Sequence, residues 1–321
     1  MTHHTLHLGD CREILQTLPE QSVNCCVTSP PYFGLRDYGM AEQIGLEPTP
    51  EQFVAELVAV FREVRRVLRD DGTLWLNLGD SYFSTTKGSG GSNPETSPKQ
   101  AWKGSENGQG GYSVKLSSGN LPIKPKDLIG IPWRVAFALQ ADGWYLRQDI
   151  IWHKPNPMPE SVTDRCTKAH EYVFLLSKSA RYWYDAAAIK EQAMTAGRTG
   201  WGFTQDHTPK PRSGSGTNER IRYQEPRHED RNRRSVWTIA TQPYSGAHFA
   251  TFSPALVEPC ILAGCPIDGT VLDPFSGSAT TGQVALANAR NYIGCELNPE
   301  YHELAQRRLD GAQLGLPLTP P

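Results

Sequence analysis

The sequence has no pattern typical of a metal site, a disulfide framework or a membrane span. Its cysteines number seven, an odd count, and no two are spaced as Cys-x-x-Cys. The nine histidines show no metal-ligand spacing, so we expect no bound metal and reduced thiols, as in the cytoplasm. No apolar run approaches the roughly 18 residues that a transmembrane helix needs. The N-terminal residues also lack the basic and apolar segments of a secretion signal.

A strong charge of either sign is also missing. The formal net charge of the 321-residue chain is −2, which argues against indiscriminate binding to nucleic acid. Basic residues gather instead in two tracts, residues 84–126 and 207–235. Basic loops on a neutral body suit an enzyme that contacts phosphates with one face. They are equally consistent with solvated loops.

Strand-like and helix-like segments alternate along most of the chain. Residues 22–28 form an apolar run typical of a strand buried on both faces. Thr49-Pro50 opens a long helix with one apolar stripe, which Asp71-Gly72 ends. The alternation predicts an α/β fold, a doubly wound and mainly parallel sheet. Two polar tracts, residues 84–120 and 186–235, interrupt it.

Two consecutive prolines follow the apolar strand over residues 22–28. Ser29-Pro30-Pro31-Tyr32 stand at its carboxyl end, where neither proline donates a backbone hydrogen bond. A rigid turn is the simplest interpretation of such a pair. A second motif, near the other end of the chain, favours a functional interpretation.

That second motif is Asp273-Pro274-Phe275-Ser276-Gly277-Ser278, which leaves a strand and enters a helix. Glycine and serine at this point let backbone amides approach a ligand at a helix N-terminus. The next strand ends in Glu296, an acid placed to bond both hydroxyls of a ribose. The G-x-G-x-x-G pattern of dinucleotide enzymes is not met, which disfavours a nicotinamide oxidoreductase.

Together these segments resemble the S-adenosylmethionine-dependent DNA methyltransferases that modify exocyclic amino groups. Residues 273–278 are similar to the family's cofactor motif, Asp-Pro-Phe-x-Gly-x-Gly, with Ala279 in place of its last glycine. Residues 28–32 are similar to its catalytic motif, (Asn/Asp/Ser)-Pro-Pro-(Tyr/Phe). The resemblance implies S-adenosyl-L-methionine as cofactor, double-stranded DNA as substrate, and a seven-stranded, Rossmann-like methyltransferase sheet with an inserted irregular recognition region.

The order of the two motifs, catalytic before cofactor, resembles the family's β-type, a circularly permuted arrangement. The N-terminal strand that ends at Asp10 then takes a place beside the last strand of the chain, and neighbouring chain ends make such a permutation simple. The resemblance implies a set of cofactor-contacting residues: Asp10, Thr28, His248, Phe249, Thr251, Phe252, Asp273, Phe275, Gly277, Ser278 and Glu296.

The resemblance gives Ser29, Pro30, Pro31 and Tyr32 a catalytic role. An exocyclic amine is a weak nucleophile, and acceptors such as the Ser29 hydroxyl and the Pro30 carbonyl favour its tetrahedral form. Tyr32 is placed to stack on a base flipped out of the duplex. A serine before Pro-Pro-Tyr resembles the cytosine-N4 branch more than the adenine-N6 branch, so N4 of cytosine is the expected target.

Other substrates stay open: N6 of adenine, RNA, a protein glutamine, or no substrate at all in a non-catalytic DNA-binding relative. Pro259-Cys260 lies on a helical apolar stripe, so we expect it to belong to the core and not to act as the nucleophile of a cytosine-C5 methylase. A partner restriction endonuclease, a homodimer, and a bacterial or a phage host are left open.

We expect the chain to divide into a catalytic half (residues 1–83 and 121–185), a flexible insert (84–120), a target-recognition region (186–235) and a cofactor-binding half (236–315). The basic residues expected to contact DNA are Arg36, Lys210, Arg212, Arg220, Arg222, Arg231, Arg233 and Arg234.

Overall fold

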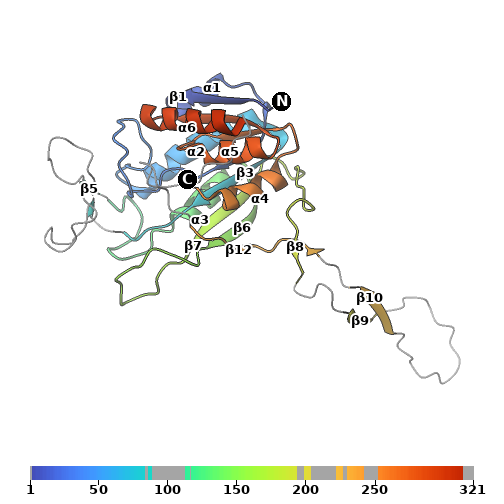
Figure 1. Cartoon of the computed structure of the whole chain (residues 1–321). Coiled ribbons are helices and arrows are strands. Elements are labelled where there is room, and N and C mark those ends of the chain that lie inside the picture. Colours follow the sequence, from blue (N-terminus) through green and yellow to red (C-terminus); the bar gives the residue numbers. More distant parts are fainter. Residues whose placement is uncertain are drawn as a thin grey trace. The chain divides into compact units, whose positions relative to one another are not determined.

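The structure is a computed structural model that describes residues 2–83, 86–88, 113–115, 117–193, 199–203, 222–226, 230–241 and 252–313. Its contacts divide the chain into two units, residues 1–185 with 235–321, and residues 186–234. A sheet of eight strands, in the order β1-β14-β13-β2-β3-β7-β6-β12, is the frame of the first unit (Figure 1).

The fold class expected from the sequence is confirmed, with one strand more than the seven expected. The eight strands are β1 (His4–Leu8), β2 (Val23–Thr28), β3 (Leu68–Leu78), β6 (Tyr145–His153), β7 (His170–Ser177), β12 (Val236–Thr238), β13 (Thr270–Asp273) and β14 (Asn291–Glu296). All run parallel except β7, which is antiparallel to both β3 and β6. The additional strand is β12, whose three residues pair with β6 and are too short for a recognisable sequence pattern.

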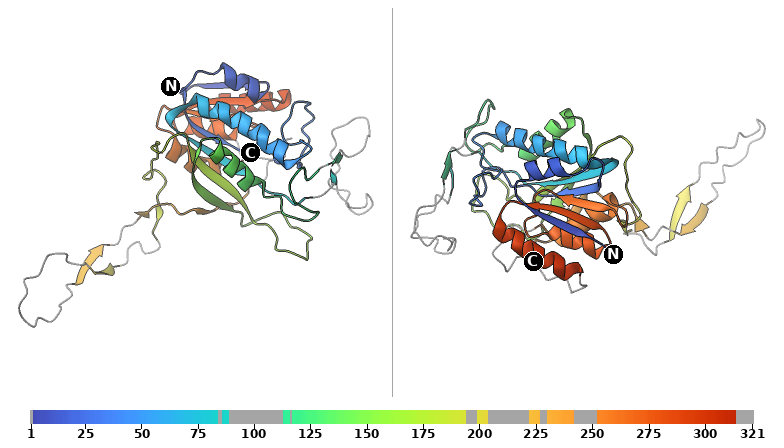
Figure 2. Two further views of the ribbon diagram at one scale, coloured as in Figure 1. Left: turned by 180° about the vertical axis from the view of Figure 1, so that it is seen from behind. Right: turned by 90° about the horizontal axis from the view of Figure 1, so that it is seen from above.

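Helices cover both faces of this sheet, as a doubly wound fold requires (Figure 2). On one face lie α1 (Cys11–Thr17), α2 (Pro50–Val67) and α3 (Ile131–Ala141), and α2 contacts both of the others. On the other face lie α4 (Pro254–Gly264), α5 (Thr280–Ala287) and α6 (Pro299–Gln313), and α5 contacts both of the others. Pro259 and Cys260 lie buried in α4, with the thiol donating to the carbonyl of Leu256, so their expected place in the core is confirmed.

Helix α2 begins as its sequence predicts. The Thr49 hydroxyl accepts a hydrogen bond from the amide of Gln52, and Pro50 occupies the first turn, where its missing N–H has no cost. Its buried side chains form one stripe: Phe53, Leu57, Val60, Phe61, Val64 and Val67. The helix ends at Val67 and not at Asp71, because Leu68 already pairs with Val23 of β2.

The permuted arrangement is confirmed by the pairing of the first and last strands. His4 of β1 lies opposite Tyr292 of β14, and the two strands run parallel. Helix α6 contacts both of them. At the centre of the sheet β13 and β2 are neighbours, and their following helices, α5 and α2, lie on opposite faces. Such a switch point opens a crevice at the carboxyl ends of the strands.

The remaining strands form three two-stranded pairs. In the second unit β8 (Glu191–Gln192) pairs with β11 (Asp230–Arg231), and β9 (Thr199–Phe203) pairs with β10 (Arg222–Pro226). In the first unit β4 (Thr86–Gly88) pairs with β5 (Ser113–Lys115). None of the helices in the described parts of the chain is long and apolar enough to cross a membrane.

Candidate active site

A cavity of about 630 Å³ opens at the carboxyl ends of the central strands. Its lining comes from the ends of β1, β2, β13 and β14, from the loop that follows β2, and from the start of α5. This volume is in the usual range for a small-molecule site, and its place is the switch point between β13 and β2.

Asp273 and Thr28 join the two strands at this point. The Thr28 hydroxyl donates to Oδ1 of Asp273 over 2.6 Å, and the amide of Phe275 donates to the same oxygen over 3.0 Å. Burial raises the pKa of Asp273 to about 6, and the bonds from Thr28, Thr281 and Phe275 act in the opposite direction. Asp273 therefore fixes the loop that begins at Pro274. Thr28 is fully buried behind it and does not line the cavity.

Glu296, at the end of β14, faces the same loop. Its Oε2 accepts the amide of Gly277 over 2.8 Å, and its Oε1 accepts the amide of Asn298 over 2.8 Å. Burial raises the pKa of Glu296 to about 7, although the two amide bonds favour its charged form. Each carboxylate oxygen keeps a further lone pair. The ionised side chain can therefore accept two hydroxyl hydrogens from a ligand in the cavity.

The loop between β13 and α5 has two residues in the left-handed region of backbone conformation. Gly277 has φ +54° and Ala279 has φ +59°, a conformation that costs an L-residue about 1–2 kcal/mol. Arg308 donates to the carbonyl of Ser278 over 2.6 Å, and Tyr292 donates to the Ser276 hydroxyl over 2.9 Å. Ala279 therefore adopts the backbone conformation that glycine favours, and neighbouring side chains hold the loop.

Ser29, Pro30, Pro31 and Tyr32 also line the cavity. The Tyr32 hydroxyl donates to Glu171 over 2.7 Å, and the Ser29 hydroxyl donates to Asn77 over 3.2 Å. Burial and the nearby Glu171 raise the pKa of Tyr32 well above its ordinary value. The Tyr32 ring lies so close to Gly79 that a Cβ at that position would be 2.4 Å from its Cε2 atom. Tyr32 is thus a neutral side chain held in one place.

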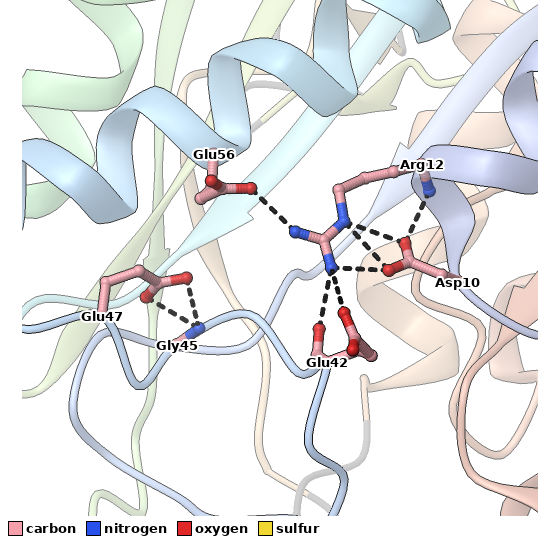
Figure 3. Close-up of polar contacts among 6 residues, drawn as sticks. All are labelled: Asp10, Arg12, Glu42, Gly45, Glu47 and Glu56. Atoms are coloured by element: carbon pink, nitrogen blue, oxygen red, sulfur yellow. Dashed lines mark hydrogen bonds and ion pairs between the residues drawn. The ribbon is translucent and has the colours of Figure 1, made fainter.

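Arg12 connects three segments of the chain beside the cavity (Figure 3). Its guanidinium donates to both oxygens of Asp10, to Glu56 of α2 over 2.9 Å, and to the carbonyl of Glu42 over 3.0 Å. Burial alone would raise the pKa of Asp10. The hydrogen bonds and the charge of Arg12 together outweigh burial, so the pKa of Asp10 is lowered. The carboxylate of Glu47 accepts the amide of Gly45 nearby. The loop after Tyr32 is therefore anchored to the strand end that carries Asp10.

Most of the sequence-predicted site residues meet in this one cavity. Those that line it are Asp10, Ser29, Pro30, Pro31, Tyr32, Arg36, Phe252, Asp273, Phe275, Gly277, Ser278 and Glu296. Six other predicted residues lie outside the described ranges: His248, Phe249, Thr251, Lys210, Arg212 and Arg220.

The remaining residues expected to contact DNA lie in the second unit. Arg231 and Arg234 both pair with Glu191, over 2.8 and 2.6 Å. Arg233 lies between them in sequence, and Arg222 lies on β10.

Several cavity residues were not singled out in the sequence. They include Gln43, Asn77, Lys154, Glu171, Leu297 and Tyr301. A usable signal existed for Asn77, a polar residue within the apolar strand over residues 74–78. Glu171 and Lys154 lie at the ends of two strands, and nothing in their local sequence links them to Tyr32.

Comparison with known proteins gives consistent matches over nearly the whole chain. The family model described as DNA methylase, of the N6/N4 type, matches residues 23–307. The Type II methyltransferase M.Cfr9I of Citrobacter freundii is 47% identical over 96% of this chain and 88% of its own length. The Type II methyltransferase M.SmaI of Serratia marcescens is 46% identical over 94% of this chain and 89% of its own length.

Solved structures show the same fold at lower identity. The PvuII DNA methyltransferase (cytosine-N4-specific) matches with a TM-score of 0.61 and 19% identity, over 95% of this chain and 86% of its own. A Thermus thermophilus protein solved in complex with S-adenosyl-L-methionine matches with a TM-score of 0.57 and 24% identity, over 98% of this chain and 96% of its own. From the family model and the two close relatives, this chain belongs to the N6/N4 DNA methylase family.

Proposed function

We propose that this protein transfers a methyl group from S-adenosyl-L-methionine to N4 of a cytosine in double-stranded DNA. The observation that carries the proposal is that Ser29 and Tyr32 line the same cavity as Asp273, Gly277 and Glu296. One cavity thus offers acceptors for an amine and acceptors for a nucleoside cofactor. Relatives named as Type II methyltransferases, and a fold shared with a cytosine-N4-specific enzyme, support it.

The chemistry of the donor set fits the cofactor. Glu296 offers an oriented carboxylate for two ribose hydroxyls, as acids at this position do in related nucleotide sites. Phe275 and Leu297 provide apolar surface, and Asp10 offers a second carboxylate at the end of β1. When bound, S-adenosyl-L-methionine supplies an electrophilic methyl group on a sulfonium sulfur.

The residues around Ser29 act on the target amine. The lone pair of the N4 amine is delocalised into the cytosine ring, so hydrogen-bond acceptors that draw its hydrogens aside make the nitrogen a better nucleophile. Ser29 donates its own hydrogen to Asn77, which leaves its oxygen lone pairs for the amine. Tyr32, neutral and held beside Gly79, supplies a ring for stacking on the flipped base. The proton that N4 loses on methylation passes to solvent water.

We propose further that residues 186–235 contact the target sequence. In support, Arg231 and Arg234 of this region both lie against Glu191, and arginine side chains are common contacts to phosphates. A partner endonuclease and a homodimer stay predictions from the sequence.

The test is to incubate the purified protein with S-adenosyl-L-methionine and genomic DNA from a strain that lacks methyltransferases. The DNA is then digested to nucleosides and analysed by mass spectrometry. We expect N4-methylcytosine. N6-methyladenine would overturn the cytosine assignment and keep the amine chemistry. No methylated base, with cofactor binding intact by calorimetry, would exclude DNA as substrate and direct the assay to RNA and protein glutamine.

A further inference from the structure

A group of polar side chains lies behind Ser29 and Tyr32 and comes from three strands. Asn77 is on β3, Glu171 is on β7, and Lys154 directly follows β6. Oε2 of Glu171 accepts the Tyr32 hydroxyl over 2.7 Å and the Asn77 amide nitrogen over 3.3 Å. Its Oε1 accepts the ammonium of Lys154. One carboxylate thus receives three donors.

The surroundings of Asn77 fix which way its amide points. Nδ2 donates to Glu171 and also to the backbone carbonyl of Tyr172 over 3.0 Å. Neither partner carries a hydrogen to donate in return, so Oδ1 must face the opposite side. There it accepts the Ser29 hydroxyl over 3.2 Å. It also shares the single hydroxyl hydrogen of Tyr32, which lies 3.2 Å from Asn77 and 2.7 Å from Glu171. Asn77 is almost fully buried, with 1% of its surface exposed, so water cannot substitute for these partners.

The direction of these bonds determines what Ser29 offers to the cavity. Because its hydrogen is committed to Asn77, only lone pairs remain on its oxygen. An amide turned the other way would donate to Ser29 and free the hydroxyl hydrogen to point at the target amine. The serine would then donate a hydrogen bond to the amine nitrogen, and the nitrogen lone pair would be less available to attack the methyl group. The direction of the hydrogen bond between Ser29 and Asn77 therefore matters as much as the position of Ser29.

We propose that Glu171 is a positioning residue that orients Asn77 and Tyr32, and through them makes the Ser29 hydroxyl an acceptor for the target amine. This inference rests on the proposed amine methylation. Only 16% of the Glu171 side chain and 18% of the Lys154 side chain are exposed, so a carboxylate here needs good partners. Lys154 provides one, and its ammonium also lies 4.2 Å from the centre of the Trp152 ring.

A carboxylate is required at position 171 because donors approach both of its oxygens. Glutamine has nearly the same shape but offers one acceptor and one donor. In a Glu171→Gln variant the new NH₂ group must face either the Lys154 ammonium or the pair of Tyr32 and Asn77. Removing the ammonium resolves the conflict. In a Lys154→Met, Glu171→Gln double variant, the NH₂ can turn toward methionine, and the oxygen can still accept from Tyr32 and Asn77.

The experiment measures kcat for methyl transfer at saturating cofactor and DNA in wild type, E171Q, K154M and the double variant. We expect E171Q to lower kcat about 10-fold to 100-fold, the usual effect of small misplacement at a reacting centre. Cofactor affinity, measured by calorimetry, should change by less than about twofold. In the K154M background the same substitution should lower kcat by less than about threefold. A Glu160→Gln variant is the control, because Glu160 pairs with Arg165 and does not line the cavity.

An equal loss of kcat from E171Q in both backgrounds, or no loss in either, would overturn the proposal. So would a crystal structure of E171Q in which Asn77 and Tyr32 keep their positions and partners, a measurement that does not depend on activity. A wild type that produces N6-methyladenine would refute the cytosine assignment alone, since the four variants can then be compared on that product. The two failures are thus distinguishable.

Discussion

Thr28 and Asp273 are 245 positions apart in the chain, and a 2.6 Å hydrogen bond joins their side chains at the centre of the sheet. Thr28 lies one residue before Ser29, and Asp273 opens the loop that reaches Gly277. This bond therefore links the loop that we propose to face the target base with the loop that we propose to face the cofactor.

Replacing Thr28 with valine keeps the shape and removes the hydroxyl. Asp273 is 2% exposed, and a buried carboxylate that loses a donor costs about 1–3 kcal/mol. We expect the free energy of unfolding in urea to fall by that amount, and the affinity for S-adenosyl-L-methionine to fall with it. Thr28→Ser, which keeps the hydroxyl, should behave like wild type. A Thr28→Val variant as stable as wild type would show that the hydrogen bond does not stabilise the fold.

Glu296 should make the stability of the ligand-free protein depend on pH. Its pKa in the folded state is about 7, above its ordinary value of 4.5, so the folded protein binds more protons than the unfolded chain between these values. Stability must then fall as pH rises from about 5 to 8, by up to about 3 kcal/mol from this group. Asp273, with a pKa of about 6, adds a change of the same sign.

Urea unfolding at pH 5 and pH 8 measures this change, and Glu296→Gln should remove the part that belongs to Glu296. A wild type whose stability rises over the same range would contradict the burial of a neutral Glu296.

Gly79 sets the position of Tyr32 from behind. An added Cβ would lie 2.4 Å from Cε2 of the ring and 3.1 Å from its Cζ atom, distances that force the ring to move. We expect Gly79→Ala to lower kcat about 10-fold or more, because a displacement of this size disturbs the reacting geometry. Cofactor affinity should stay unchanged. The same clash should lower the melting temperature. In a Tyr32→Ala background, Gly79→Ala should leave the melting temperature unchanged, and a decrease there would refute the clash.

Tyr32 itself should matter for the base and not for the cofactor. Tyr32→Ala removes the ring, and stacking of a base on an aromatic side chain is worth about 1–3 kcal/mol. We expect kcat/KM for DNA to fall about 10-fold to 100-fold, while the dissociation constant for S-adenosyl-L-methionine stays nearly constant. Tyr32→Phe separates the ring from the hydroxyl. Equal losses of methylation and of cofactor binding would show that Tyr32 has been assigned the wrong role.

Arg12 should stabilise the loop after Tyr32. Arg12→Met keeps much of the aliphatic length and removes the bonds to Asp10, Glu42 and Glu56. Since 31% of the Arg12 side chain is exposed, solvent screens part of the effect, and we expect a loss of about 1–2 kcal/mol. Limited proteolysis after Arg36 should become faster, with Arg307→Met as the exposed control. Unchanged cleavage would show that the loop holds its conformation without Arg12.

The parts of the site that the sequence predicts are those coded by short patterns at strand ends. Ser29–Tyr32, Asp273–Ser278 and Glu296 each follow an apolar run, and parallel strands bring their carboxyl ends to one edge. No short sequence pattern predicts the contact of Tyr32 with Glu171. It depends on the register of β3 against β7, where Asn77 lies opposite Val173. Strand β12 was missed for a related reason, since three residues carry no periodicity.

The pairing of β1 with β14 also has a consequence for how the protein is made. His4 leaves the ribosome early, and its partner Tyr292 follows only after most of the chain has been synthesised. Until then β1 has no strand on which to form its ladder, and contacts of such long sequence separation form slowly. Asp10 and Glu296, at the ends of these two strands, come together in the same late step. A nascent chain that stops before Asn291 therefore lacks part of the cavity that we propose to bind the cofactor.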